Sequence, residues 1–576
     1  MKTTTPKTQN REAQAPCLAH PAFAELDRHF ARFIARFGDG ENMALVAAHL
    51  SRSVRLGHTC LDLTHPPATE TGEPMPWIPL AEALDAIAQS RAVSVAETKT
   101  TTPLVLDSAN RLYLRRYFDY KTALAKALLN RTNPDAAPCA EGQESAIAAA
   151  LGNPLTVISG GPGTGKTTTV VEILSRSMAQ CQPTPRIALA APTGKAAARL
   201  EQTVRDGLTR RGFSDLLAAV PRASTLHRLL GVRGDSPTFK HNAANPLALD
   251  LLVVDEASMV PLPLMAKLFD ALPPHARLVL LGDRDQLASV EPGNVLAEIV
   301  DAAALPGSPL AGSLAVLRKN YRFGNESSIY QLCEAVRTGR SGDALAMLEA
   351  IASTDGDLGS APLAASQRLS EALRAPVLAG YGPYLRERDP IAALEAFGRF
   401  RILCAVREGP CGIHEFNRRI EALLREARLI DGPPHLYAGM PVLITRNDPQ
   451  IGLFNGDIGI LLPDPAQSGA PAAPLWAWFP GDGESPALRR IAPPQLPDHE
   501  PAFAMTVHKS QGSEFDRVLL VLPERDSPVV TRELIYTGLT RARQRVDLWS
   551  DKGVFERGVA RRTERASGLR DALDAS

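Results

Sequence analysis

The sequence "GGPGTGKT" at residues 160–167 constrains the fold more than any other part of this 576-residue chain. It follows the apolar run "LTVIS" and precedes the helix-forming run "TTTVVEILSRSM". A glycine-rich loop between a strand and a helix lets backbone N–H groups surround phosphates, and the helix N-terminus adds a favourable dipole. A chance glycine-rich turn is the alternative, but it does not account for this strand–loop–helix context.

This loop predicts a site for a nucleoside triphosphate and Mg²⁺, and the resemblance given below implies that the nucleotide is ATP. Lys166 would contact the β- and γ-phosphates, and the Thr167 hydroxyl would ligate Mg²⁺. The nucleotide-binding residues that we predict from the loop are Gly160, Gly161, Pro162, Gly163, Thr164, Gly165, Lys166, Thr167 and Thr168.

Short apolar runs alternate with helical patterns from about residue 140, which is typical of an α/β fold with a parallel sheet. After the loop these runs are "RIALAAP", "LLVVDEA" and "RLVLLGD". A second α/β region starts near residue 312 with "GSLAVLRKNYRF" and continues with "FRILCAV" and "DRVLLVLP". Residues 441–502 interrupt it with short β-like stretches and a Pro-rich run, so we predict a small β-barrel-like insert there.

The N-terminal part contains no motif for chemistry. Residues 1–20 are expected to form a flexible tail. Phe23, Leu26, Phe30, Phe33 and Phe37 then recur at helical spacing, and the runs "LVLD" and "RLYL" predict a hairpin. We therefore expect a mostly helical domain at residues 1–110.

Polar residues follow two of the predicted strands. "LLVVDEAS" ends in Asp255, which could hold Mg²⁺, and Glu256, which could orient the attacking water and accept its proton. "LVLLGDRDQL" presents Gln286, which could sense the γ-phosphate. The alternatives are an acidic surface turn and an ordinary polar loop residue. A nucleotide loop upstream favours the catalytic interpretation for the two carboxylates.

Two further strand–loop–helix segments could contact nucleic acid. In "LAAPTGKAAARL", Thr193 and the helix N-terminus could bind a phosphate, with Lys195 nearby, and "STLHRLLG" offers Thr225 and His227. Arg322 and Arg541 would reach a nucleotide that lies between two domains and stabilise transition-state charge. The alternative for both is a solvated surface arginine.

Composition mainly excludes some classes of protein and some kinds of site. The chain has 63 basic and 63 acidic residues, so no global positive field attracts nucleic acid and any DNA contact needs a local groove. Seven cysteines without a CxxC pair indicate reduced thiols in a cytoplasmic protein. We expect no signal peptide and no membrane span.

These motifs, in their order, resemble the superfamily 1 helicases of the branch that moves 5′→3′ along single-stranded DNA. The resemblance runs from Gln143, in "EGQESAI", to Arg541. It implies that Gln143 recognises adenine and that Arg322 and Arg541 contact the γ-phosphate. It also implies that residues 441–502 form an SH3-like insert. In "TVHKSQGSEF", Thr506, His508 and Lys509 become candidates to hold DNA phosphate, while Gln511, Gly512 and Glu514 lie closer to the nucleotide.

The N-terminal runs "GHTCLDL" and "PLVLDSANRLYLRRYFDYK", with "FRILCAVREGPCGIHEFNRRIEALL", are similar to the RecD family, the α subunits of exodeoxyribonuclease V. This resemblance implies RecB and RecC as partners, docking through the N-terminal domain, and duplex-end as well as single-stranded DNA as substrate. It implies two RecA-like P-loop motor domains, at residues 111–304 and 305–576. No nuclease centre is evident, so we expect RecB to cut.

Three other interpretations remain open from the sequence. The chain could be a stand-alone RecD-like or Pif1-like helicase. It could be an ATPase in which ATP only switches assembly, or a structural subunit with an inactive site, although the complete set of motif residues disfavours the last.

Overall fold

The computed structural model describes most of the chain between residues 16 and 574. Outside the description lie residues 1–15, 38–39, 68, 70–72, 97, 99–100, 134–135, 137, 139–140, 181–183, 214–216, 218–219, 235, 237, 323, 325–326, 351–355, 365–367, 435, 449, 465–473, 482–487 and 575–576. Most of the predicted N-terminal tail, Cys139, Cys181 and much of the Pro-rich run therefore lie outside it. The other five cysteines are free thiols.

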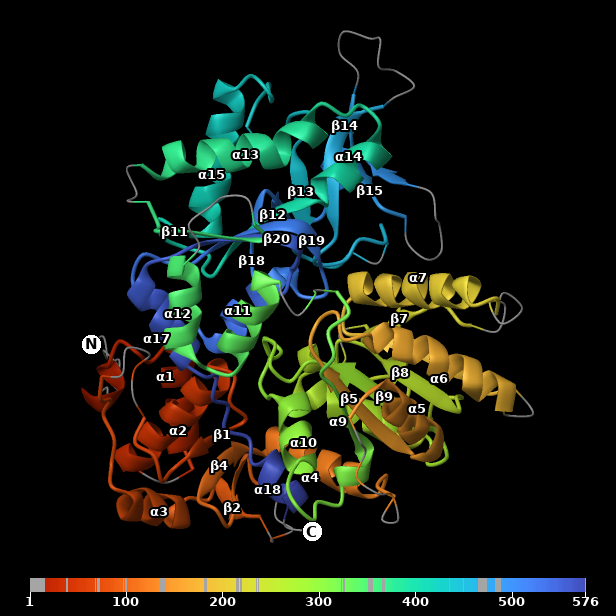
Figure 1. Cartoon of the computed structure of the whole chain (residues 1–576). Helices are drawn as coiled ribbons and strands as arrows, with labels where there is room; N and C mark the ends of the chain where they lie inside the picture. The colour runs from red at the N-terminus through yellow and green to blue at the C-terminus, as the bar shows by residue number, and fades with distance from the viewer. Residues whose placement is uncertain are drawn as a thin grey trace, which may run out of the picture.

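The N-terminal unit combines helices with a small sheet (Figure 1). Its sheet has the order β1-β4-β3-β2, and β3 and β4 form the predicted hairpin, with Asn110 at a positive φ of 58° in the turn. Because β4 belongs to this sheet, the unit extends past the predicted boundary at residue 110. Its elements are η1 (Pro16–Ala19), α1 (Glu25–Ala35), α2 (Gly40–Arg55), α3 (Leu80–Gln89), β1 (Cys60–Asp62), β2 (Val93–Val95), β3 (Leu104–Leu106) and β4 (Arg111–Leu114).

The first lobe is a six-stranded parallel sheet of order β10-β5-β9-β8-β6-β7, covered by helices on both faces. Helices α4, α9 and α10 pack on one face, and α5, α6 and α7 on the other. The strands are β5 (Leu155–Gly160), β6 (Ile187–Ala191), β7 (Ser224–Thr225), β8 (Leu251–Val254), β9 (Arg277–Gly282) and β10 (Leu314–Leu317). The helices are α4 (Arg115–Leu129), α5 (Gln143–Gly152), α6 (Lys166–Gln180), α7 (Gly194–Arg210), α8 (Leu226–Leu230), η3 (Ala257–Met259), α9 (Leu262–Ala271), α10 (Val295–Ala303) and η4 (Ala311–Ser313).

The second lobe is a five-stranded parallel sheet of order β11-β20-β19-β12-β18. The strands are β11 (Leu358–Ala361), β12 (Phe400–Cys404), β18 (Ala504–Thr506), β19 (Phe515–Val521) and β20 (Ala542–Trp549). The helices are α11 (Ser328–Arg337), α12 (Ser341–Ala350), α13 (Leu369–Leu385), α14 (Pro390–Phe397), α15 (Ile413–Glu426), η7 (His508–Ser510), α16 (Arg532–Leu539) and α17 (Lys552–Ala560). The predicted α/β class, with two parallel-sheet motor domains, is confirmed.

An antiparallel sheet of order β16-β15-β14-β13-β17 interrupts the second lobe between β12 and β18. Its buried side chains belong to the same apolar core as those of the second lobe, so the insert packs on that lobe (Figure 1). The likeness to an SH3 domain stays a prediction. The elements are β13 (Pro441–Ile444), β14 (Ile458–Pro463), β15 (Leu475–Phe479), β16 (Arg489–Ile491), η6 (Pro493–Gln495) and β17 (His499–Pro501).

Two segments lie in a different part of the fold from the one that we predicted. Strand β10, which we placed at the start of the second α/β region, pairs with β5 in the first sheet. An apolar parallel strand has the same pattern in either sheet, so the sequence does not show which one it joins. The C-terminal helix α18 (Leu569–Asp574) packs on α4 and α10 of the first lobe instead of the second. Thr59 N–H donates to the Ala566 carbonyl at 2.9 Å, so the chain just before α18 contacts the N-terminal unit.

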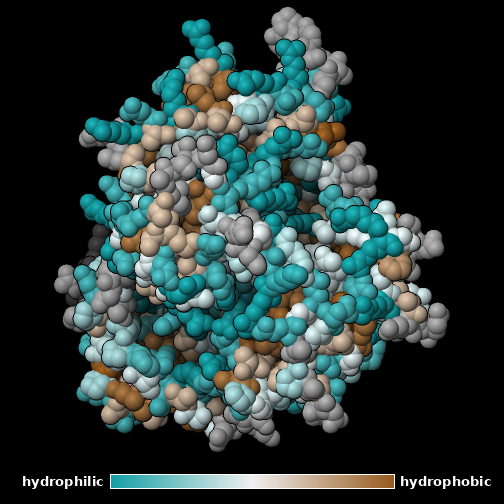
Figure 2. Space-filling model, viewed as in Figure 1, coloured by the Kyte–Doolittle hydropathy of each residue, from teal (hydrophilic) through white to brown (hydrophobic). Residues whose placement is uncertain are grey.

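Figure 2 shows a face dominated by hydrophilic residues, on which apolar patches are scattered. Within the part of the chain that the structure describes, every helix is too short or too polar to cross a membrane.

Candidate nucleotide site and nucleic-acid interface

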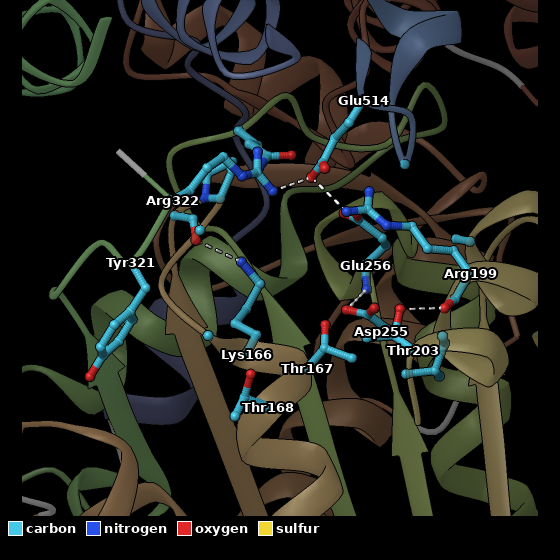
Figure 3. Close-up of a pocket in the computed structure, with 18 of the residues that line it drawn as sticks. Lys166, Thr167, Thr168, Arg199, Thr203, Asp255, Glu256, Tyr321, Arg322 and Glu514 are labelled. Atoms are coloured by element: carbon cyan, nitrogen blue, oxygen red, sulfur yellow. Dashed lines mark hydrogen bonds and ion pairs between the residues drawn. The ribbon is translucent and has the colours of Figure 1, made fainter. Parts of the chain in front are cut away.

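A cavity of about 340 Å³ is lined by residues from both lobes (Figure 3). Its walls come from segments that are far apart in the chain: the loop after β5, helix α7, the ends of β8 and β9, and the segments after β10, before β19 and before β20. It brings together all six residues that we predicted as catalytic, which are Lys166, Asp255, Glu256, Gln286, Arg322 and Arg541.

The loop between β5 and α6 has the geometry of a phosphate cradle. Gly163 and Gly165 have φ values of 81° and 83°, in the left-handed region that only glycine adopts readily. The Lys166 ammonium donates to the Gly160 carbonyl and, at 3.1 Å, to the Gly161 carbonyl. Helix α6 begins at Lys166, so its free N–H groups point toward the cavity and favour an anion there.

Gln143 lies behind this loop, at the first position of α5. Its Nε2 donates to the Thr164 carbonyl at 3.4 Å. A Cβ atom at Gly165 would meet the same Nε2, so the Gln143 side chain packs directly against this glycine. Gln143 does not line the cavity itself.

The carboxylates Asp255 and Glu256 follow β8. Glu256 has a φ of 52° and a ψ of 40°, a left-handed conformation that is costly for a residue other than glycine. Its N–H donates to Asp255 Oδ1 at 2.8 Å. Burial, together with the neighbouring Glu256 charge, raises the pKa of Asp255 to about 6. Such a carboxyl favours a nearby cation, because a cation stabilises its ionised form.

Gln286 is held in the loop after β9, where its Nε2 donates to Asp283 Oδ2 at 3.1 Å. The next residue, Leu287, is bound on both backbone groups by the second lobe. Its N–H donates to Thr537 Oγ1 at 2.9 Å, and its carbonyl accepts from Gln511 Nε2 at 2.9 Å. Its side chain is buried in the apolar core of the second lobe. The loop that carries Gln286 is therefore attached to both lobes, a contact that the sequence did not indicate.

Arg541 is buried beside the cavity, on the second lobe. Its guanidinium donates to the carbonyls of Thr537 at 3.0 Å and Ser513 at 3.2 Å, and to Thr540 Oγ1 at 3.3 Å. Burial lowers its pKa, while the charges of Glu256 and Glu514 act in the opposite direction. A buried arginine bonded to neutral oxygens keeps its positive charge for an anion in the cavity.

Arg322 and Arg199 share one carboxylate, that of Glu514 (Figure 3). Sequence reasoning missed Arg199, although it follows Lys195 by four residues in "KAAARL" and therefore lies on the same helix face. It also missed Asn320 and Tyr321. The Tyr321 N–H donates to the Gly163 carbonyl at 2.8 Å, and Asn320 Nδ2 donates to the Pro162 carbonyl at 3.0 Å. The segment before Arg322 is thus bonded to the phosphate-binding loop.

The predicted DNA-binding residues lie outside the cavity, near the ends of β6, β7 and β18. In parallel sheets these carboxyl ends are where ligands commonly bind. Thr193 and Thr225 are N-caps: their hydroxyls accept the N–H groups of Ala196 at 3.3 Å and Arg228 at 3.2 Å. Each therefore fixes a helix N-terminus that faces outward from the sheet edge.

The remaining candidates differ in their accessibility. Lys195 is exposed to solvent, with its ammonium 6.0 Å from the Phe515 ring of the other lobe. His227 is also exposed, and its ring lies 5.8 Å from that of Phe239.

The candidates on the second lobe are less accessible, because they are partly or fully buried or are paired with other residues. Thr506 is buried, and its hydroxyl accepts the Lys509 N–H at 3.3 Å. The Lys509 ammonium is paired with Glu500 at 2.7 Å, a partner that the sequence did not indicate. His508 is half-buried, and burial lowers its pKa, so it is neutral near pH 7.

Three family models match this chain. They are the N-terminal domain of RecBCD enzyme subunit RecD at residues 19–113, an AAA domain at residues 143–292, and a UvrD-like helicase C-terminal domain at residues 501–548. RecBCD enzyme subunit RecD of Mycobacterium tuberculosis is 38% identical over 583 residues, covering 96% of this chain and 95% of the relative. The chain belongs to the RecD family. The predicted family and its class, ATP-dependent DNA helicase, are both confirmed.

Two further proteins are similar to part of this chain. The ATP-dependent RecD2 DNA helicase of Deinococcus radiodurans is 32% identical over 74% of this chain, which spans 51% of that protein. A solved Pif1 helicase structure has 17% identity and a TM-score of 0.41, and covers 72% of this chain and 92% of the Pif1 chain.

Proposed function

We propose that this member of the RecD family moves 5′→3′ along single-stranded DNA, as the ATP-driven motor subunit of a RecBCD-type complex in double-strand-break repair and recombination. The observation that carries the proposal is the cavity between the lobes. It gathers the phosphate-binding loop, three carboxylates and three arginines around one space, and its walls belong to two separate sheets. A ligand there would bias how the two lobes approach each other.

The residues of the cavity fit ATP with Mg²⁺. The Thr167 hydroxyl and the Asp255 carboxylate are oxygen donors of the kind that Mg²⁺ prefers, and phosphate oxygens and waters would complete its shell. Bound ATP supplies the phosphoryl group that is transferred to water. Lys166 neutralises phosphate charge, and Glu256 orients the attacking water and takes its proton. Gln143 reads the adenine edge, as the family resemblance implies.

Three residues respond to the γ-phosphate. Arg322 and Arg541 would stabilise charge on the transferring group, an effect of about 10³–10⁵ in rate for arginines in this position. Gln286 would detect the same group, and its neighbour Leu287 would pass the change to the second lobe through Thr537 and Gln511.

The DNA strand would run along the outer ends of the two sheets. Thr193, Thr225 and the helices that they cap would bind phosphates from the first lobe, and Lys195 would add charge. Thr506, His508 and Lys509 would do so from the second lobe. Because these residues sit on both lobes, closing and opening the cavity would change the spacing of the phosphate contacts, which is how ATP turnover becomes movement.

RecB and RecC are the proposed partners, with the N-terminal unit as the docking region. The match of residues 19–113 to the RecD N-terminal domain supports this, as does the coverage of 95% of a relative named as a RecBCD subunit. Co-expression with RecB and RecC should give one complex by size-exclusion chromatography. A chain that elutes alone while it hydrolyses ATP and unwinds DNA would instead support a stand-alone helicase.

Lys166→Gln tests the nucleotide assignment. The variant loses the charge that neutralises phosphate, so we expect its single-stranded-DNA-stimulated ATP hydrolysis to be abolished while the complex still assembles. ATP turnover is measured by phosphate release and assembly by co-purification. Undiminished turnover in an assembled complex would overturn the assignment.

A further inference from the structure

Glu514 collects three guanidinium groups at the edge of the cavity. Its Oε1 accepts from Arg199 Nη2 at 2.7 Å and from Arg322 Nη2 at 2.5 Å (Figure 3). Its Oε2 accepts from Arg543 Nε at 3.2 Å. The Glu514 side chain is only 8% exposed. Burial alone would raise its pKa, but the charges of Arg199 and Arg322 hold the pKa of Glu514 well below its usual range. The carboxyl is therefore ionised at neutral pH.

The two oxygens of Glu514 connect different parts of the molecule. Oε2 binds an arginine of β20, the strand that pairs with β19 in the same sheet, so this bond stays within the second lobe. Oε1 binds Arg199 on α7 of the first lobe and Arg322 in the segment that follows β10. Asn320 Oδ1 accepts the Arg322 N–H at 2.8 Å, and this segment is bonded to the phosphate-binding loop. One oxygen atom therefore joins α7, the nucleotide loop and the second lobe.

Helix α7 also begins at the predicted DNA contacts. Thr193 caps it, and Lys195 lies in its first turn. Arg199 follows Lys195 by one helical turn on the same face, about 6 Å further along the axis. The loop before Glu514 runs beside this first turn: a Cβ atom at Gly512 would lie 3.5 Å from that of Ala196. A phosphate that displaces the N-terminus of α7 would therefore displace Arg199 too.

ATP would compete for one of the arginines on Oε1. A phosphate carries more charge than a carboxylate and can bind one guanidinium through two oxygens. In the structure, Arg322 has to share a single carboxylate oxygen with Arg199. A γ-phosphate that drew Arg322 from Glu514 would leave Oε1 to Arg199 alone. The undivided charge of that oxygen would then bind Arg199 more strongly, and α7 would be drawn toward the second lobe.

We propose that Arg199 and Glu514 are positioning residues that couple ATP binding to the grip on single-stranded DNA. This inference rests on the proposed function and adds the pair through which the nucleotide site and the DNA side communicate. Because coupling between two binding sites is thermodynamically reciprocal, ATP and single-stranded DNA should each change the affinity for the other by the same factor.

The coupling is measured in the full chain as the ratio of its DNA affinities with and without bound nucleotide. Single-stranded DNA is titrated by fluorescence anisotropy with and without a non-hydrolysable ATP analogue and Mg²⁺. We expect the analogue to change the DNA dissociation constant of the parent protein by about 5-fold or more, the usual range for coupled sites. Arg199→Gln and Glu514→Gln should each bring the ratio toward 1, and the double variant should add little to either, because both break one interaction.

Arg543→Gln is the matched control. It removes an ion pair from the same carboxylate but leaves both contacts of Oε1, so its ratio should equal that of the parent. Arg199→Lys keeps the charge and should restore part of the ratio. A variant that is merely less stable would show a lower thermal unfolding midpoint. Such a loss of stability would not by itself change the ratio of the two DNA affinities in Arg199→Gln and leave it unchanged in Arg543→Gln. If Glu514→Gln does not fold, Arg199→Gln decides, because its side chain is 41% exposed.

The inference is overturned if Arg199→Gln keeps the parent ratio, or if Arg543→Gln loses as much of it. Either result, in variants that retain DNA-stimulated ATP hydrolysis, leaves the proposed function standing. A parent protein that neither binds single-stranded DNA nor hydrolyses ATP in its presence would contradict the proposed function itself.

Discussion

The residues that line the cavity and the proposed DNA-binding residues differ in where their hydrogen-bond partners lie in the sequence. In the cavity, the bonds join segments far apart in the chain, such as Glu514 with Arg199 and Leu287 with Thr537. On the DNA side, the hydroxyls of Thr193, Thr225 and Thr506 each accept an N–H group three residues later. The first kind of site changes when the lobes move, whereas the second is fixed within one lobe. Substitutions in the two regions should therefore affect different measurements.

The largest effect is expected from Glu256→Gln. The variant keeps the size of the side chain but cannot accept a proton, so kcat for ATP hydrolysis should fall by about 10²–10⁴. Affinities for ATP and single-stranded DNA should change little, because the phosphate-binding loop and the outer ends of the sheets are untouched. Single-turnover ATP hydrolysis and DNA anisotropy measure these quantities. If Glu256→Gln lost DNA affinity and kept its kcat for ATP hydrolysis, the cavity and the proposed DNA-binding region would not have separate roles.

A smaller effect is expected from pH, through Asp255. A raised pKa means that this carboxyl takes up its proton near pH 6 instead of near pH 4. At subsaturating Mg²⁺, nucleotide affinity should be full above pH 7 and should fall about tenfold per unit below pH 6, since the protonated carboxyl cannot ligate the cation. Fluorescent nucleotide titrations from pH 5 to pH 8 follow this. Asp255→Asn should bind weakly at every pH, and a parent-like pH profile in that variant would assign the titration to another group.

The smallest effect is expected from Lys195→Ala. This side chain is exposed and adds one charge to the proposed phosphate track, so the loss in DNA affinity should be modest. The slope of log affinity against log salt should fall in magnitude by about 0.7, the value for one phosphate contact on a single strand. Basal ATP hydrolysis without DNA serves as the internal control. An unchanged salt slope would place the strand elsewhere.

Local motifs were the predictable part of the molecule. The loop at residues 160–167, the carboxylates after β8 and the hairpin at β3 and β4 are each specified by neighbouring residues, so spacing alone indicates them. The pairing of β10 with β5 and the return of α18 to the first lobe depend on packing between distant segments, and an apolar run does not identify its partner.

The same reason explains which site residues were missed. Arg199 resembles any exposed helical arginine until Glu514, more than 300 positions later, is placed beside it. Glu500, the partner of Lys509, lies across the junction between the insert and the second lobe. Tyr321 and Asn320 become part of the site only because β10 joins the first sheet next to the phosphate-binding loop.

The central claim is that closure of the cavity by ATP moves the chain along one strand in one direction. The direct measurement is unwinding of two duplexes that differ only in the polarity of a single-stranded tail, with Lys166→Gln as the control for turnover. We predict ATP-dependent unwinding from the 5′ tail, little from the 3′ tail, and none by the variant. Unwinding of the 3′-tailed duplex, or ATP hydrolysis without unwinding of either, would contradict it.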